Sequence, residues 1–350
     1  MSVSMEAIQP GVMQMLQVNM GWQENEKLLV VTDVPAPAHW GEWSPAQLEE
    51  VQGRALLARA VAEIARKEFP ARRVAFLAYP ATGRSGSEPD GETAASLRQA
   101  EVVVAITSFS LSHTGAREEA CRAGARVASM PDFLAEMFFA DGPMAVDYRQ
   151  VAAETASIAS RLTLVREATV RSPAGTDISF SLEGREGRAD HGLYVHPGDW
   201  GNLPAGEAYV APLEGTARGV MVVEPGWFPG LEVPLRLHFR QGEVVQVEGG
   251  GRLGEYLLTL LGLSSPAGPT AEERARRNLA ELGIGTNPKA RRTDITLEAE
   301  KIKGTVHLAI GDSAHMGGRT VADYHADFVI PRATLLLDGQ VVMEEGNWVA

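Results

Sequence analysis

The sequence predicts an α/β N-terminal domain with a Rossmann-like parallel sheet, followed by an α+β C-terminal domain with a curved antiparallel sheet. Short, uniformly apolar runs alternate with helical patterns in the first half, whereas alternating apolar and polar residues dominate the second half. A chain of 350 residues with 45% hydrophobic side chains is long enough for two cores. We therefore expect two domains, 1–165 and 166–350.

Four apolar runs mark the strands expected in the first domain: 27–35, 73–80, 102–108 and 125–129. A helix is expected over 44–70, because Ser44 can cap its N-terminus, Pro45 suits its first position and Pro70 stops it. Apolar strands separated by helices are typical of a parallel sheet that is covered on both faces. None of these strands is followed by a GxGxxG or GxxxxGK[ST] motif, so the sequence indicates no nucleotide cofactor.

The second domain is introduced by a helical pattern over 148–165. Alternating residues and turn signals predict antiparallel hairpins over 169–192 and 235–250. The segment 269–285 is interpreted as a helix that ends at a glycine, and strand signals dominate again from Gly304 onward.

Composition excludes several classes of function. A net charge of −13, without a run of lysine or arginine, disfavours a nucleic-acid partner. The single cysteine excludes an internal disulfide framework, and no apolar run approaches the roughly 18 residues of a membrane-spanning helix. The N-terminus lacks the basic region of a signal peptide. We expect a soluble cytoplasmic protein without a membrane partner.

Histidine and carboxylate residues in the second half suggest a metal site. His325 and Asp327 in DYHADFVI are two residues apart in a predicted strand, so their side chains point to the same face. His307 stands in the apolar strand GTVHLAIG, where a histidine can equally be a core residue with satisfied hydrogen bonds. Glu281 lies in the apolar segment NLAELGIGTNP, and a buried carboxylate requires a cation or a hydrogen-bond donor.

Glu207 completes the candidate set, because it lies between a turn rich in glycine and proline and an apolar strand. Each of the five residues alone also has a structural explanation. Together they provide three carboxylates and two imidazoles, which suit Zn, Mn or Co. Three acids exceed the needs of one ion, so the set favours two divalent metals per chain that share a carboxylate and activate water.

Four segments in this order resemble the metal-site motifs of the thermophilic aminopeptidase family, which comprises the aminopeptidase T and S metallopeptidases: GNLPAGEAYVAP, LAELGIGTNP, KGTVHLAIGD and YHADFVI. The similarity covers mainly residues 170–345. It implies a co-catalytic pair of divalent ions, release of N-terminal amino acids from peptides, and a homodimer. The residues that match the family's ligands by position are Glu207, Glu281, His307, His325 and Asp327.

The residues that handle protons differ from those of the family, because the family's tyrosine beyond the first histidine is missing here. Ser313, Ala314 and His315 stand in its place. His315 is a candidate oxyanion donor or proton carrier, although it can equally be a surface histidine. Glu281 is the other catalytic candidate, as a carboxylate that handles the proton of the attacking water.

Two alternatives stay open beside the metallo-aminopeptidase. A dihydroxypyridine ring-cleaving dioxygenase is similar in length and in its C-terminal H-x-D, and it uses one ferrous ion held by two histidines and an aspartate. Its position equivalent to Glu281 is interpreted as a histidine, so we favour the hydrolase, unless His307 supplies the second imidazole from another place. The second alternative is a protein of the same fold without peptidase activity. The expected substrate is a peptide or a small molecule.

Overall fold

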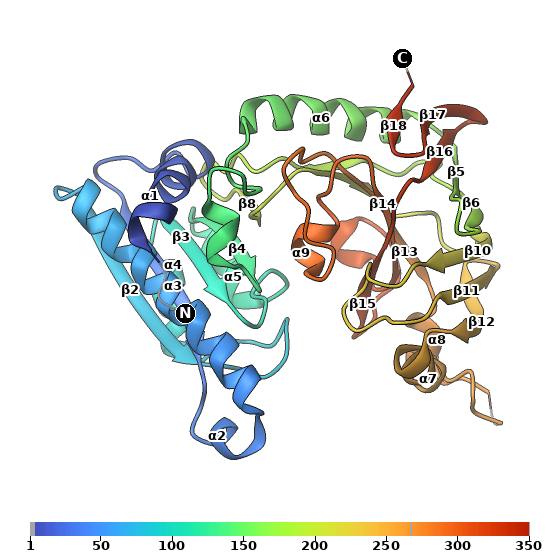
Figure 1. Cartoon of the computed structure of the whole chain (residues 1–350), viewed down its shortest axis with the longest axis horizontal. Coiled ribbons are helices and arrows are strands. Elements are labelled where there is room, and N and C mark those ends of the chain that lie inside the picture. The colour runs from blue at the N-terminus through green and yellow to red at the C-terminus, as the bar shows by residue number, and fades with distance from the viewer. Residues whose placement is uncertain (1–3, 267, 350) are drawn as a thin grey trace. The chain divides into compact units, whose positions relative to one another are not determined.

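The computed structural model describes residues 4–266 and 268–349 (Figure 1). The chain forms two compact units. Unit 1 contains residues up to Arg149 together with Gly192–Ala205, and unit 2 contains Gln150–His191 and the chain from Gly206 onward. This division differs from the expected boundary at residue 165, because most of the long helix after Tyr148 lies in unit 2 and a later segment returns to unit 1.

Unit 1 is built on a parallel sheet with the strand order β2-β1-β3-β4-β8. Its strands are β1 (Lys27–Val34), β2 (Arg73–Pro80), β3 (Val102–Thr107), β4 (Arg126–Pro131) and β8 (Trp200–Asn202). Its helices are α1 (Met5–Gln14), η1 (Met15–Asn19), α2 (His39–Glu42), α3 (Pro45–Glu68), α4 (Gly91–Arg98), α5 (Gly115–Arg122) and η2 (Ala135–Phe138). The four predicted strands are present, whereas β8 has three residues and no periodicity that could have revealed it.

The capping predicted for α3 is present. The Ser44 hydroxyl accepts a hydrogen bond from the Gln47 amide, and the Gln47 side chain accepts one from the Ser44 amide. On one face of the sheet, Leu29 and Val31 of β1 pack with Leu97 of α4, and this cluster extends to α5. Helix α3 packs against β1, β2 and β3, and α1 packs against α3.

Unit 2 contains two antiparallel sheets. The larger sheet has the strand order β12-β11-β10-β6-β5-β16-β17-β18. Its strands are β5 (Glu167–Arg171), β6 (Asp177–Ser181), β10 (Arg218–Val223), β11 (Leu235–Arg240), β12 (Glu243–Gly249), β16 (Thr334–Leu337), β17 (Gln340–Glu344) and β18 (Asn347–Trp348). The smaller sheet has the order β15-β14-β13-β9-β7. Its strands are β7 (Arg188–Asp190), β9 (Glu207–Val210), β13 (Leu279–Gly285), β14 (Val306–Gly311) and β15 (His325–Ile330). The helices of the unit are α6 (Tyr148–Leu164), α7 (Gly251–Leu260), α8 (Ala271–Ala275), α9 (Thr296–Ala299) and η3 (Ala314–Met316).

The predicted fold class is confirmed, with a parallel sheet followed by antiparallel structure, although two antiparallel sheets replace the single one expected. One local prediction is wrong: the helix over 269–285 ends at Ala275, and its second half is strand β13. All seven residues of β13 are buried, and the strand lies between β14 and β9. A strand that is buried on both faces has a continuous apolar sequence, which periodicity alone cannot distinguish from a buried helix.

One hydrophobic core joins the two sheets of unit 2. The smaller sheet contributes alternate residues, namely Ala208, Val210, Leu282, Ile284, Val306, Leu308, Ile310, Phe328 and Ile330. The larger sheet contributes residues such as Val170, Phe180, Met221, Leu237 and Leu335. Because strand side chains alternate, the odd-numbered residues of β9, β14 and β15 point to the opposite face of the smaller sheet.

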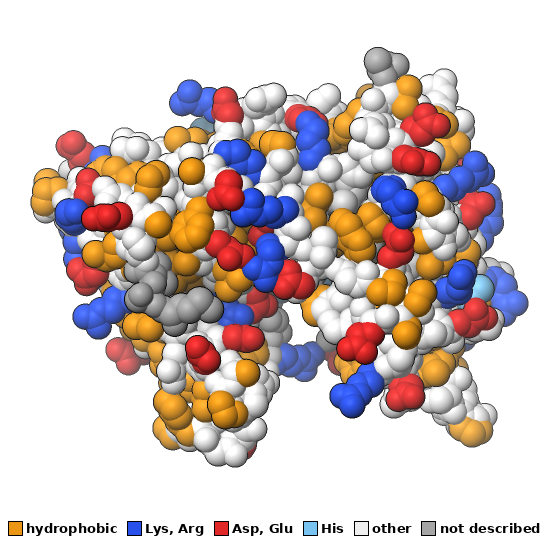
Figure 2. Space-filling view, viewed as in Figure 1, with side chains coloured by type: hydrophobic (Ala, Val, Ile, Leu, Met, Phe, Trp, Pro, Cys, Tyr) orange, Lys and Arg blue, Asp and Glu red, His pale blue; other side chains and the backbone are white. Residues whose placement is uncertain are grey.

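The surface carries both signs of charge. Acidic and basic side chains are interspersed over the face shown in Figure 2, in keeping with a chain that has 45 acidic and 32 basic residues. Every helix in the described part of the chain is too short or too polar to cross a membrane.

Candidate metal centre

The face of the smaller sheet that points away from the core carries all five residues predicted as ligands. Glu207 begins β9, Glu281 is in β13, His307 is in β14, and His325 and Asp327 are in β15. Their strands are neighbours in the sheet, so side chains far apart in the sequence meet on one face.

A β-bulge gives Glu281 its direction. Leu279 pairs with Ile310, but Glu281 pairs with Ala309, so β13 advances two residues while β14 advances one. Leu279 therefore points into the core, and Glu281, two residues later, points to the opposite face. Without this bulge the two side chains would share a face, and the carboxylate would point into the hydrophobic core.

Distances within the cluster are short. His325 Nε2 lies 3.3 Å from Glu281 Oε2 and 3.3 Å from Asp327 Oδ1. His307 Nε2 lies 3.5 Å from Glu281 Oε1. Glu281, His307 and Asp327 each offer one ligand atom, and these atoms lie within 4.8 Å of one another. Glu281, His307 and Asp327 could therefore share one ion, and His325 lies directly beside two of them.

Neighbouring backbone fixes the tautomer of His325. Its Nδ1 lies 2.8 Å from the carbonyl oxygen of Asp312, which can only accept a hydrogen bond. Nδ1 must then carry a proton, so Nε2, which faces Glu281 and Asp327, is the ring atom that would bind a metal. This is the usual second contact of a histidine that binds a metal.

Unpartnered polar atoms indicate that these residues fit a cation. Among the described residues, His307 Nδ1, His307 Nε2 and Asp327 Oδ1 are buried without a hydrogen-bond partner. Such atoms are rare in native proteins, since leaving them unpaired costs free energy. An ion held between His307 and Asp327 would satisfy two of the three atoms.

Within the cluster, the two side chains on β15 are more exposed than those on β13 and β14. The side chains of His307 and Glu281 are 1% and 5% exposed, whereas those of His325 and Asp327 are 21% and 17% exposed.

Charges in the cluster shift the pKa values of its members. Burial works to raise the pKa of Glu281, but the adjacent His307 and His325 hold it below its usual range. Burial works to lower the pKa of His307, but Glu281 and Glu207 raise it to about 9. In the metal-free protein, imidazolium protons therefore supply the positive charge that a metal ion would otherwise bring.

Glu207 lies at the edge of the cluster and has another partner. Its Oε1 is 3.9 Å from His307 Nε2, while its Oε2 accepts a hydrogen bond from the Lys301 ammonium. Lys301 also lies 2.9 Å from Glu300 and 3.7 Å from Asp190. Burial works to lower the pKa of Lys301, but these carboxylates hold it well above its ordinary value. The side chain is therefore a buried ammonium.

His315 lies beside the cluster rather than in it. Its Nδ1 is 2.5 Å from Asp312 Oδ2, and its ring centroid is 5.2 Å from that of His325. Arg188 donates a hydrogen bond to the His315 carbonyl, and Asp312 accepts one from the Ala322 amide, so the loop is held at both ends. The Asp312 carboxylate orients the imidazole. The sequence alone had left open whether His315 is a surface residue or a catalytic one.

The sequence missed several residues that shape this region: Asp190, Gly283, Glu300 and Lys301. The letters EAEKIKG around Lys301 look like an exposed charged turn, and only the structure reveals that its ammonium is buried. Gly283 had a weak signal, because a glycine inside an apolar strand often marks a close approach. A Cβ at this position would lie 1.9 Å from His307 Nε2.

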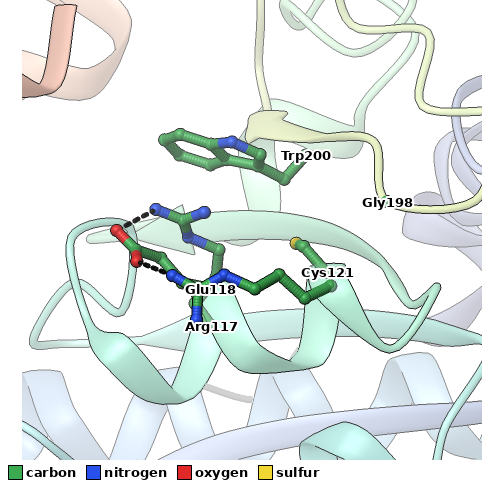
Figure 3. A pocket seen from close by; sticks show the side chains of 6 residues that line it. Arg117, Glu118, Cys121, Gly198 and Trp200 are labelled. Carbon is green, nitrogen blue, oxygen red and sulfur yellow. Dashed lines mark hydrogen bonds and ion pairs between the residues drawn. The ribbon is translucent and has the colours of Figure 1, made fainter.

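A separate pocket lies within unit 1. It has a volume of about 360 Å³ and is lined by Arg117, Glu118, Cys121, Arg122, Gly198 and Trp200. Figure 3 shows the Arg117 guanidinium beneath the Trp200 ring, at 3.8 Å from the ring centre, with Glu118 beside it. The stacked cation already has these partners, and the pocket contains none of the predicted site residues.

Comparison with known proteins gives one family match. The family described as "NicX: 2,5-dihydroxypyridine 5,6-dioxygenase" matches residues 52–350. The chain is also 25% identical over 274 residues to a 2,5-dihydroxypyridine 5,6-dioxygenase of Pseudomonas putida strain KT2440, which covers 73% of this chain and 72% of that protein.

Two solved structures share the fold. The structure of 2,5-dihydroxypyridine dioxygenase from Pseudomonas putida KT2440 superposes with a TM-score of 0.74 at 19% identity, covering 100% of this chain and 99% of that chain. Wild-type AmpT from Thermus thermophilus superposes with a TM-score of 0.65 at 16% identity, covering 99% of each chain.

Proposed function

Because this chain belongs to the 2,5-dihydroxypyridine 5,6-dioxygenase family, we propose that it is a dioxygenase that opens a dihydroxylated aromatic ring at a single ferrous ion. The observation that carries this proposal is the meeting of two imidazoles and Asp327 on one face of the smaller sheet, with buried atoms of His307 and Asp327 unpartnered.

The expected metallo-aminopeptidase is a wrong prediction. The family match and the relative from Pseudomonas putida both name a dioxygenase, so the protein is assigned to the oxidoreductases and not to the hydrolases or proteases. The expectation was correct for the fold, which AmpT shares. The reaction was misjudged because one fold can carry sites with different chemistry.

The ligand set explains why Glu281 need not exclude a dioxygenase. His307 lies on the neighbouring strand against the same carboxylate, so it supplies the second imidazole that Glu281 does not. His307, His325 and Asp327 then form the two-histidine, one-carboxylate set typical of ferrous oxygenases, and Glu281 adds a carboxylate between the imidazoles. When bound, a ferrous ion supplies the redox centre at which a dihydroxylated ring and O₂ can react.

The protein's own residues then have distinct roles. The hydrogen bond to the Asp312 carbonyl orients His325 so that its Nε2 faces Asp327. Asp327 is partly exposed and lies where the substrate enters. His315 is the proton acceptor for a ring hydroxyl. Because the Asp312 carboxylate accepts the hydrogen bond of the Nδ1–H, Nε2 is the ring nitrogen of His315 that would receive that proton. Asp312 thus orients both histidines, one through its backbone and one through its side chain.

Oxygen uptake tests the proposal. Protein loaded anaerobically with Fe²⁺ should consume one O₂ for each molecule of 2,5-dihydroxypyridine that loses its aromatic absorbance, while protein loaded with Zn²⁺ should not. Catechol and hydroquinone would define which arrangement of hydroxyls is accepted. Absence of uptake with all three compounds, in protein that retains its iron, would refute the assignment.

A further inference from the structure

We propose that the Lys301 ammonium takes the place of a second cation beside the metal centre, and that truncating this side chain opens a site for a second divalent ion. The inference rests on the metal centre proposed above, but not on the reaction assigned to it.

The structure contains two overlapping groups of ligands. The first is Glu281, His307 and Asp327, and the second is Glu207, Glu300 and His307; in each group the ligand atoms lie within 4.8 Å of one another. His307 belongs to both. Residues of the described chain thus outline two adjacent positions for cations.

Lys301 occupies the second position. Its Nζ donates a hydrogen bond to Glu207 Oε2 and lies 2.9 Å from Glu300 Oε1, so it contacts two of the three members of the second group. Asp190 is a third carboxylate at 3.7 Å. An ammonium has three donors and one positive charge, which suits three surrounding carboxylates.

Burial makes this charge pairing strong. The side chain of Lys301 is 2% exposed, and those of Glu207 and Glu300 are 8% and 12% exposed. Its backbone is also fixed: the Lys301 amide donates to the Glu298 carbonyl at 3.1 Å, and its carbonyl accepts from the Asn287 amide at 2.9 Å. The backbone that carries the ammonium is therefore fixed in the turn after α9. The ammonium fills the position between Glu207 and Glu300 that a second ion would need.

Truncating Lys301 to alanine should open the second position to a metal ion. Lys301→Ala removes the ammonium from between Glu207 and Glu300 and leaves a space lined by their carboxylates. Carboxylate ligands around such a space suit Mn²⁺, and His307 stays with the first ion. The variant should bind two ions where the natural chain binds one.

Metal content measured with Mn²⁺ alone tests this inference without any substrate. Wild-type protein, after saturation and gel filtration, should retain about one equivalent of Mn²⁺ per chain by elemental analysis, with an uncoupled electron paramagnetic resonance spectrum. Lys301→Ala should retain about two, and the spectrum should show spin coupling between them. Lys303→Ala is the matched control, because Lys303 pairs with Glu154 at 2.7 Å in a more exposed place, and it should retain one.

The outcomes separate this inference from the proposed function. Two ions in the wild type, or one ion in folded Lys301→Ala, would overturn the role of Lys301 while leaving the dioxygenase assignment intact. A wild type that binds no Mn²⁺ and no Fe²⁺ would overturn the metal centre and this inference together. If Lys301→Ala does not fold, the double variant Lys301→Ala, Asp190→Asn keeps the second ligand group with less uncompensated charge, and the same counts decide.

Discussion

Gly283 faces the His307 imidazole across β13 and β14, so closely that a Cβ on the glycine would lie 1.9 Å from Nε2 and 2.1 Å from Cε1. The ring is buried among carboxylates and cannot move aside without leaving the cluster. The missing side chain at position 283 is therefore a requirement of the metal centre.

Gly283→Ala should displace His307 and weaken metal binding by about 10–100-fold, the range found when the support of a ligand is removed. Isothermal titration with Mn²⁺ measures this. Gly53→Ala in α3 is the control, because a Cβ at Gly53 meets no atom within 4 Å. Equal affinity in the two variants would show that His307 is not a ligand.

Asp327→Asn should abolish ring opening and reduce the retained iron, since the amide keeps the shape of the side chain but removes its charge. We expect a loss of metal affinity of at least about 100-fold. Asp323→Asn is the matched control, because that carboxylate pairs with Arg276 on the surface. Iron analysis and oxygen uptake on both variants provide the comparison, and an active Asp327→Asn enzyme would exclude this ligand set.

His315→Gln should reduce kcat by about 10²–10⁴-fold, as expected for loss of a proton acceptor, while the iron content stays unchanged. Asp312→Asn should give a smaller loss, because the imidazole loses the carboxylate that orients it but stays in the site. Full kcat in a folded His315→Gln variant would exclude His315 as the proton acceptor.

Chelation should destabilise the protein. A ligand present at 100 times its Kd stabilises the folded state by about 2.7 kcal/mol, which corresponds to a rise in Tm of several degrees. Differential scanning fluorimetry should show this rise for the wild type with Mn²⁺ and a much smaller rise for Asp327→Asn. Equal shifts would mean that the ion binds elsewhere.

The sequence predicted the architecture well where periodicity was strong. Apolar runs located β1 to β4, and Ser44 with Pro45 located the start of α3. The i, i+2 spacing of His325 and Asp327 placed two side chains on one face of a strand, as the structure has them. The expected ligand roles and the expected homodimer stay predictions.

Other features depend on long-range structure that no local pattern encodes. The bulge that turns Glu281 toward the cluster needs the pairing of β13 with β14, and the apolar run over β13 was mistaken for a helix. The burial of Lys301 depends on carboxylates from β7, β9 and the turn after α9. The reaction itself was misassigned because AmpT and the dioxygenase share this fold, and a fold does not fix the chemistry of the site that it carries.

The most direct test of the account is the fate of isotopically labelled oxygen. Iron-loaded protein should be supplied with 2,5-dihydroxypyridine under ¹⁸O₂, and the ring-opened product analysed by mass spectrometry. We predict that both atoms of one O₂ molecule enter the product, and that Asp327→Asn forms none. A product without ¹⁸O, or one formed equally well without O₂, would contradict the assignment of this site as a dioxygenase.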